Sequence, residues 1–337
     1  MKGKALGGGG FRTGDVQHHV IACVDLDAPS PMAAPIPAGF LAHGFAFDPR
    51  SPWRAAAFEK KGPGACVLDL RYMALAAPIE TVASRRFYGH GAFSADGALL
   101  YATESRLDAD HEGALVVRDA DTLRELGTLP THGRAPHDCA LIDGGTVMVV
   151  ANGGGPMGGD APSVTWVEVA SGKLLDRAEL DDPRVNAGHL AVGDDGALVV
   201  VSAPRDGLDA RERGAVSLRV GAGPLRARRE PASAVSRVVG EALSVLIEPR
   251  SRTAFATHPL GDAVTAWGVD DGAHRGVLEL VEPRGIALTL DGEWLLVTHR
   301  VEGGVRLTAL DAITREPVGV GVDPSFLSGS HVVVGDW

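Results

Sequence analysis

A short sequence unit recurs along the whole chain and constrains its fold more than any other feature. In its clearest copy, the apolar stretches Gly91–Ala95 and Ala98–Thr103 flank the dipeptide Asp96-Gly97. Asp-Gly between two apolar strands is typical of a tight two-residue hairpin turn, in which both turn residues have positive φ. We therefore expect two antiparallel strands here, with His90 at the start of the first.

The unit occurs seven times with similar spacing. Copies begin near residues 43, 90, 137, 189, 244, 285 and 331, so successive starts are 47, 47, 52, 55, 41 and 46 residues apart. This is the length of a four-stranded antiparallel sheet with its turns, which is the blade of a β-propeller. The spacing is regular and no Pro/Ser-rich linker interrupts it, so the sequence predicts an all-β, seven-bladed β-propeller that forms a single domain over residues 1–337.

The two ends of the chain are expected to share one blade. The last copy stops after its first strand, while the N-terminal part has strand patterns at His19–Asp25 and Ala33–Ala38 that lack a first strand. The remaining strand must come from Lys4–Thr13, although its four consecutive glycines weaken a strand. We predict a ring that is closed by a composite blade from both termini.

Charge and hydropathy exclude two classes of partner. The formal net charge is −11, whereas nucleic-acid-binding proteins usually present a basic face. No run of 18 apolar residues is present, and the N-terminus has no apolar secretory stretch. We expect no nucleic-acid partner, no membrane insertion and, for the chain as written, no leader.

Histidines mark one end of the predicted strands. Five start the first strand of a copy, which lines the central channel of a propeller. In the two copies without that histidine, another one ends the antiparallel second strand and so lies at the same rim, where Glu104 adds a carboxylate. Imidazole with some carboxylate suits iron or copper better than magnesium or calcium. The candidate metal ligands are His43, His90, His137, His189, His331, Glu104, His258 and His299.

Two observations leave other interpretations open. A histidine near a strand can instead brace its own blade by packing and hydrogen bonding. His43 and His137 also stand six residues before the turn position, whereas His90, His189 and His331 stand five before it. Adjacent strand positions face opposite sides, so only one set faces the channel unless β-bulges absorb the offset.

Several stretches carry a resemblance to a known family. They are Phe87-Tyr-Gly-His-Gly-Ala-Phe-Ser-Ala-Asp-Gly97, Tyr101-Ala-Thr-Glu104, Pro136-His137, Val150-Ala-Asn-Gly-Gly154 and Gly188-His189-Leu190-Ala191. Together they resemble an uncharacterised bacterial seven-bladed β-propeller family, a domain of unknown function. Its members are usually exported by the twin-arginine route and encoded beside imelysin-type iron-uptake proteins. The resemblance implies a periplasmic location and periplasmic iron-uptake proteins as partners, whereas a natively leaderless chain would be cytoplasmic.

Three functions compete. The first is binding of iron or copper at a histidine-rich site on one rim of the channel, linked to metal uptake or handling. The second is a mononuclear non-haem iron or copper oxidase or oxygenase that acts on a small molecule. The third is a metal-free scaffold for another protein. No Gly-x-Ser-x-Gly, Walker or His-Glu-x-x-His motif is present, which argues against nucleophilic hydrolysis.

Overall fold

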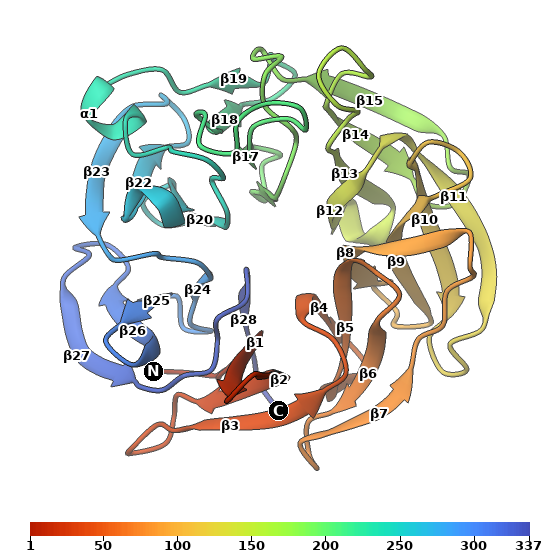
Figure 1. The fold of residues 1–337 in the computed structure, drawn as a ribbon. Coiled ribbons are helices and arrows are strands. Elements are labelled where there is room, and N and C mark those ends of the chain that lie inside the picture. Colours follow the sequence, from red (N-terminus) through yellow and green to blue (C-terminus); the bar gives the residue numbers. More distant parts are fainter.

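The protein is built almost entirely from antiparallel strands arranged as a ring of sheets (Figure 1). This computed structural model describes residues 1–337. Its helical parts are α1 (Ala232–Val235) and the 3₁₀ turns η1 (Asp143–Gly145) and η2 (Pro259–Gly261). None of them has the length and apolar character needed to cross a membrane. The all-β architecture predicted from the sequence is confirmed, and the arrangement fits a β-propeller.

The strands form five four-stranded sheets and one eight-stranded sheet. The sheet made from both ends of the chain has the order β28 (Val332–Gly335), β1 (Lys4–Thr13), β2 (Val16–Asp25) and β3 (Ala33–Ala38). The eight-stranded sheet contains β4 (Ala42–Asp48), β5 (Ser51–Gly62), β6 (Ala65–Asp69), β7 (Ala74–Pro78), β8 (Arg85–Phe93), β9 (Leu99–Arg106), β10 (Glu112–Asp119) and β11 (Glu125–Arg134). Within it, β4–β7 and β8–β11 are two antiparallel meanders that are joined where β5 pairs with β8.

The other four sheets follow in chain order. The first contains β12 (Pro136–Ile142), β13 (Val147–Asn152), β14 (Ser163–Glu168) and β15 (Leu174–Glu179), and the second contains β16 (Leu190–Val192), β17 (Leu198–Ser202), β18 (Ala215–Arg219) and β19 (Arg226–Ala227). The third contains β20 (Val245–Glu248), β21 (Thr253–His258), β22 (Ala263–Gly268) and β23 (His274–Glu279). The last contains β24 (Ile286–Leu288), β25 (Trp294–Val301), β26 (Gly304–Asp311) and β27 (Pro317–Val322).

The first strands of these meanders are neighbours around the centre of the ring. β4 contacts β8, and the series continues through β12, β16, β20 and β24 to β28, while β1 returns to β4. Apolar residues of adjacent sheets pack together between them. One such cluster combines Val199 of β17, Val216 of β18, Ala254 of β21 and Trp267 of β22. The centre of the ring is therefore the place where side chains from many distant parts of the sequence meet.

The composite sheet predicted from the two termini is present. Val332–Gly335 pairs with Lys4–Gly7 in an antiparallel register. The glycines that made β1 an unpromising strand are required by close packing, because a Cβ on Gly8 would overlap the carbonyl oxygen of Ala42, and one on Gly9 would overlap that of Phe326. The glycines allow β1 to pass directly against two other segments.

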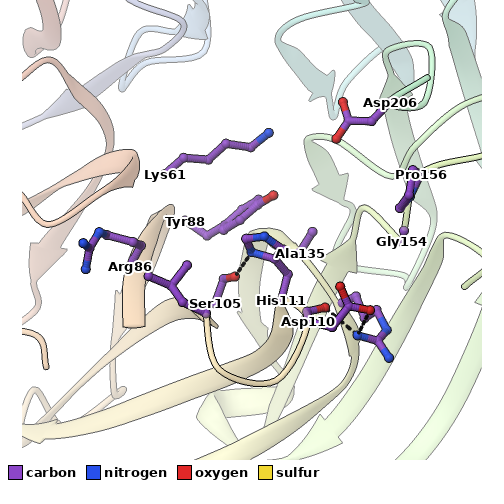
Figure 2. A pocket seen from close by; sticks show the side chains of 13 residues that line it. Lys61, Arg86, Tyr88, Ser105, Asp110, His111, Ala135, Gly154, Pro156 and Asp206 are labelled. Atoms are coloured by element: carbon purple, nitrogen blue, oxygen red, sulfur yellow. Dashed lines mark hydrogen bonds and ion pairs between the residues drawn. The ribbon is translucent and has the colours of Figure 1, made fainter. Parts of the chain in front are cut away.

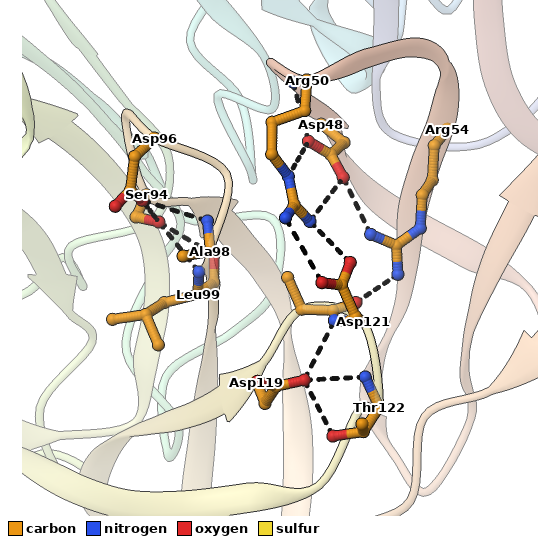
Figure 3. Close-up of polar contacts among 11 residues, drawn as sticks. Asp48, Arg50, Arg54, Ser94, Asp96, Ala98, Leu99, Asp119, Asp121 and Thr122 are labelled. Atoms are coloured by element: carbon orange, nitrogen blue, oxygen red, sulfur yellow. Dashed lines mark hydrogen bonds and ion pairs between the residues drawn. The ribbon is translucent and has the colours of Figure 1, made fainter.

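The repeated turn has a different form from the predicted one. Only Gly97 has positive φ, at 69°, and Asp96 does not. The turn spans Ser94–Gly97, in which Gly97 N–H donates to Ser94 O at 2.8 Å, and Asp96 Oδ1 accepts from Ala98 N–H at 3.0 Å (Figure 3). The prediction of a two-residue turn with two positive-φ positions was wrong because the Asp96 side chain closes a longer turn.

Ion pairs tie neighbouring turns to one another. Arg50, in the turn between β4 and β5, donates from Nη2 to Asp121 Oδ1 at 2.8 Å across to the turn after β10 (Figure 3). Arg54 Nη1 donates to buried Asp48 at 2.8 Å, and its Nη2 donates to Ala120 O. These contacts fix the two meanders of the eight-stranded sheet relative to each other at the face bearing the turns.

Candidate metal centre

The five strand-start histidines lie together at the centre of the ring. One ring nitrogen from each of His43, His90, His189 and His331 lies within 4.8 Å of the others. His137 joins them, with its Nε2 atom 3.3 Å from His43 Nε2. A metal–imidazole bond of about 2.0–2.1 Å places nitrogens on opposite sides of one ion about 4 Å apart. The four nitrogens thus surround a space of the size that one ion occupies. We call these five residues the histidine cluster.

β-Bulges resolve the register offset seen in the sequence. The pairing of β4 with β5 shifts between Ala42 and Gly44, so His43 is an extra residue in its strand. The pairing of β12 with β13 shifts in the same way around His137. An extra residue reverses the alternation of the side chains that precede it. Both histidines therefore face the same way as His90, His189 and His331.

Burial keeps the imidazoles neutral. Burial, with a smaller contribution from nearby Lys60, lowers the pKa of His90 to about 3. Burial is also the main cause that holds the pKa values of the other four well below the ordinary histidine value, with their neighbours' charges adding to the effect. A neutral imidazole has one nitrogen with a free lone pair, which is the form that binds a metal.

Hydrogen bonds to the Nδ1 atoms orient three of the rings. His189 Nδ1 donates to the carbonyl oxygen of Leu243, and His90 Nδ1 lies 3.0 Å from Asp138 Oδ1. Because the Leu243 carbonyl can only accept, the proton of His189 is assigned to Nδ1 and its lone pair to Nε2, and the ionised carboxylate of Asp138 gives His90 the same arrangement. His331 Nδ1 lies 3.2 Å from Ser244 Oγ. Carbonyl, carboxylate and hydroxyl partners of this kind commonly fix the orientation of metal-binding histidines.

Several Nε2 atoms face one another without enough protons to pair them. His43 Nε2 lies 3.0 Å from His189 Nε2 and is also close to His137 Nε2, but one proton can satisfy only one of these contacts. The Nε2 atoms of His90 and His331 are buried and have no hydrogen-bond partner at all. Unsatisfied buried polar atoms are costly, and a cation at the centre would satisfy them together.

Three of the predicted ligands are not part of the cluster. Glu104 is completely buried, and its Oε1 atom accepts from Arg118 Nη2 at 2.5 Å, while Oε2 accepts from Thr81 Oγ1 at 2.6 Å.

The other two predicted ligands, His258 and His299, bond to threonines. His258 Nε2 bonds Thr265 Oγ1 at 2.8 Å, and His299 Nε2 bonds Thr308 Oγ1 at 2.9 Å. The partners of both histidines lie on the third strand of the same sheet. These side chains point along their own sheets, so position at the same rim was an insufficient criterion.

Two residues of the site were not anticipated. Asp138 supports His90 and also accepts from Leu190 N–H at 3.0 Å, and burial raises its pKa to about 7. Its place directly after His137 in the sequence was the available signal. Lys60 lies near enough to lower the pKa of the cluster histidines and pairs with Glu241 at 3.6 Å. No sequence pattern identified Lys60.

Two adjoining hollows lead from the surface to the cluster. The outer hollow has a volume of about 290 Å³, and Lys61, Tyr88, His111 and Asp206 are among its lining residues (Figure 2). The inner hollow, of about 70 Å³, shares Lys61, Tyr88 and Asp206 with the outer one and is bordered by His137. The cluster is thus accessible from the side of His137.

The fold and the site together define a class: an all-β protein, with a ring of antiparallel sheets, whose buried histidine cluster could bind a metal ion. Residues 36–323 match the family described as "Protein of unknown function (DUF1513)". The chain belongs to this family, and the match includes four of the five cluster histidines but not His331.

Comparison with solved structures adds a relative in fold. Kuenenia stuttgartiensis Hydrazine Synthase has a TM-score of 0.68 and 13% sequence identity, over 88% of this chain and 92% of that chain. At this identity the likeness shows a shared fold alone. No curated protein matches the sequence.

Proposed function

We propose that the protein binds one transition-metal ion, iron or copper, through the histidine cluster and takes part in uptake or handling of that metal. The observation that carries this proposal is the convergence of neutral imidazoles whose Nε2 atoms have too few protons to pair one another. Imidazole ligands suit iron and copper among the common metals of cells. Four or five nitrogens from separate strands favour retention of the ion.

The proposal includes the architecture and the surroundings of the site. We interpret the eight-stranded sheet as two blades joined at β5 and β8, which gives seven blades around the cluster. A periplasmic location and periplasmic iron-uptake proteins as partners extend the same proposal, and they follow from the family resemblance described above.

Metal analysis tests the proposal directly. Protein purified without a histidine tag and exposed to ferrous or cupric ions should retain about one ion per chain after desalting. His90→Ala and His189→Ala should each lose most of it. His258→Ala is the matched control, because His258 is also a histidine inside the fold, fully buried at the end of β21, but lies outside the cluster. Equal metal content in all four proteins would refute the proposal.

One observation favours a second candidate, a mononuclear non-haem iron or copper oxidase or oxygenase. The inner hollow borders His137, and a small molecule there would be next to the cluster. Catalysis needs an open coordination position, which retention does not. Nitric oxide, used as a dioxygen surrogate, should then give a new paramagnetic signal with the ferrous protein. A stoichiometric nitrosyl signal would favour the enzyme, and its absence would favour retention.

A further inference from the structure

The outer hollow has the features of a ligand site in its own right. It lies next to the inner hollow that reaches His137 of the histidine cluster. Its volume of about 290 Å³ is at the lower end of the range for small-molecule sites. The polar groups in its walls determine what kind of molecule fits.

One wall carries two hydrogen-bond donors without partners. Tyr88 is only 8% exposed, yet its hydroxyl makes no hydrogen bond within the protein and points into the hollow (Figure 2). Burial raises the pKa of Tyr88 to about 12, and the charge of Asp206 adds to the shift, so the phenol is protonated and can donate. The Lys61 ammonium lies 5.7 Å from the centre of the Tyr88 ring and has no ion pair. The ring of Tyr88 is thus buried, while its hydroxyl stays free to donate to a ligand in the hollow.

The backbone around Lys60 and Lys61 brings both side chains to the inner hollow, and this conformation costs energy. Lys61 has φ of 60°, and the pairing of β5 with β8 shifts between Lys60 and Gly62. Side chains on neighbouring residues of a regular strand face opposite sides, but here Lys60 and Lys61 both line the inner hollow. Left-handed backbone at a residue other than glycine is uncommon and concentrates at binding sites.

The same conformation recurs around the outer hollow. Asp110, His111 and Ala135 also line it and have φ of 49°, 61° and 53°. Together with Lys61 they make four of its thirteen lining residues. Nine other non-glycine residues with positive φ are spread over the rest of the chain, so four at one hollow are a local concentration, which is consistent with a binding site.

The opposite wall offers an acceptor. Asp206 faces the hollow across from Lys61 and Tyr88 (Figure 2), and its carboxylate has no hydrogen-bond or ion-pair partner. The other carboxylate in the lining, Asp110, is already paired with Arg134 at 2.8 Å. A ligand thus meets a cation and a neutral donor on one side and a free carboxylate on the other.

We infer that the outer hollow binds a small carboxylic acid that also carries a hydroxyl or ammonium group. Its carboxylate accepts from Lys61 Nζ and the Tyr88 hydroxyl, and its hydroxyl or ammonium donates to Asp206. Charge-assisted hydrogen bonds of this kind give both affinity and orientation. That the bound acid lies beside a metal ion rests on the proposed function, whereas its binding to the hollow does not.

Calorimetric titration of metal-free protein tests the inference. The probes are malate, which has the hydroxyl, aspartate, which has the ammonium, and succinate, which has neither. Lys61→Asn removes the ammonium but tolerates the left-handed backbone, and Tyr88→Phe removes only the hydroxyl. Lys173→Asn, at an exposed lysine remote from the hollow, is the matched control.

We expect malate or aspartate to bind, with succinate at least about fivefold weaker. Lys61→Asn should weaken binding by about tenfold or more, Tyr88→Phe should weaken it less, and Lys173→Asn should leave it unchanged. If folded protein binds neither malate nor aspartate at millimolar concentration, or if Lys61→Asn binds as wild type does, the inference is overturned. Equal binding of succinate would overturn the role of Asp206 and with it the ligand class.

The same samples separate this inference from the metal proposal. Metal content is measured on each protein after a parallel incubation with ferrous or cupric ions. Binding of the acid by wild-type protein that retains no metal would support the inference and refute the metal proposal alone. Retention of metal without binding of either acid would support the metal proposal and refute the inference about the outer hollow.

Discussion

Substitution of Glu104 by Gln should destabilise the protein strongly and leave its metal content unchanged. Glu104 and Arg118 are both completely buried, and their side chains meet at 2.5 Å. Arg85 Nε lies 3.0 Å from the same carboxylate. The neutral amide would leave the Arg118 guanidinium in the core without its counter-charge. Nε and Nη1 of Arg118 already lack hydrogen-bond partners, and its other contacts, the Glu80 carbonyl oxygen and the Phe87 ring, carry no counter-charge.

The magnitude follows from the cost of an unpaired buried charge. Breaking a buried ion pair by removal of one partner costs roughly 3–5 kcal/mol of folding free energy. For a chain of this size that lowers the thermal midpoint by on the order of 10 °C. The double variant Glu104→Met/Arg118→Met removes both charges and should recover much of the loss, because apolar replacement of a whole buried pair is often neutral.

Two measurements on the same samples provide the test. Urea and thermal unfolding of wild type, Glu104→Gln and the double variant give the stability change, and metal analysis gives the bound ion. The sequence suggested Glu104 as a metal ligand, and the structure makes it an ion-pair partner in the core. A Glu104→Gln protein with unchanged stability and reduced metal would refute the structural argument.

Three further predictions concern the fold. Deletion of residues 331–337 removes β28, its pairing with β1 and the buried side chain of Val332, so the thermal midpoint should fall by many degrees; an unchanged midpoint would contradict closure by β28. Gly8→Ala should destabilise by more than about 2 kcal/mol in urea unfolding because the new methyl meets the Ala42 carbonyl, whereas Gly127→Ala, with open space around it, should change stability by under about 0.5 kcal/mol. Burial lowers the pKa of His258 to about 3, below the value of about 6.5 in the unfolded chain. The contribution of neutral His258 to the free energy of unfolding is therefore complete above pH 6.5 and is lost as the pH falls from 6.5 toward 3. At pH 5 the loss is about 2 kcal/mol, and His258→Gln should show a correspondingly shallower decline in stability with acid; identical pH profiles would show that His258 is not buried as neutral imidazole.

The repeat pattern predicted the fold because it reports local chemistry that the structure uses. Glycines with positive φ at positions 97, 196 and 292 close equivalent turns in three sheets. The predicted turn type was wrong because side-chain acceptors such as Asp96 close a longer turn. The strand Lys4–Thr13 was the least convincing part of the pattern, since the reason for its glycines lies in segments distant in the sequence, at Ala42 and Phe326.

The sequence predicted those features of the candidate site that depend on the order of the strands. It did not predict the features that depend on the direction in which a side chain points. Five histidines at strand starts meet because first strands surround the centre. The turn spacing revealed the register offset of His43 and His137, but it could not show whether β-bulges absorb that offset, and these bulges are what turn both side chains inward. Position at one rim failed for Glu104 because its carboxylate is paired with the buried guanidinium of Arg118 inside its own sheet.

The order of the cluster residues along the chain affects when the site can form. His43, His90, His137 and His189 are made early, but His331 belongs to the segment that enters the composite sheet beside β1. A chain emerging from the ribosome therefore cannot assemble the complete cluster until its C-terminal segment has been made and has joined the first strand. A partly synthesised or truncated chain would present only some of the histidines, so a tightly held ion would distinguish finished molecules from unfinished ones.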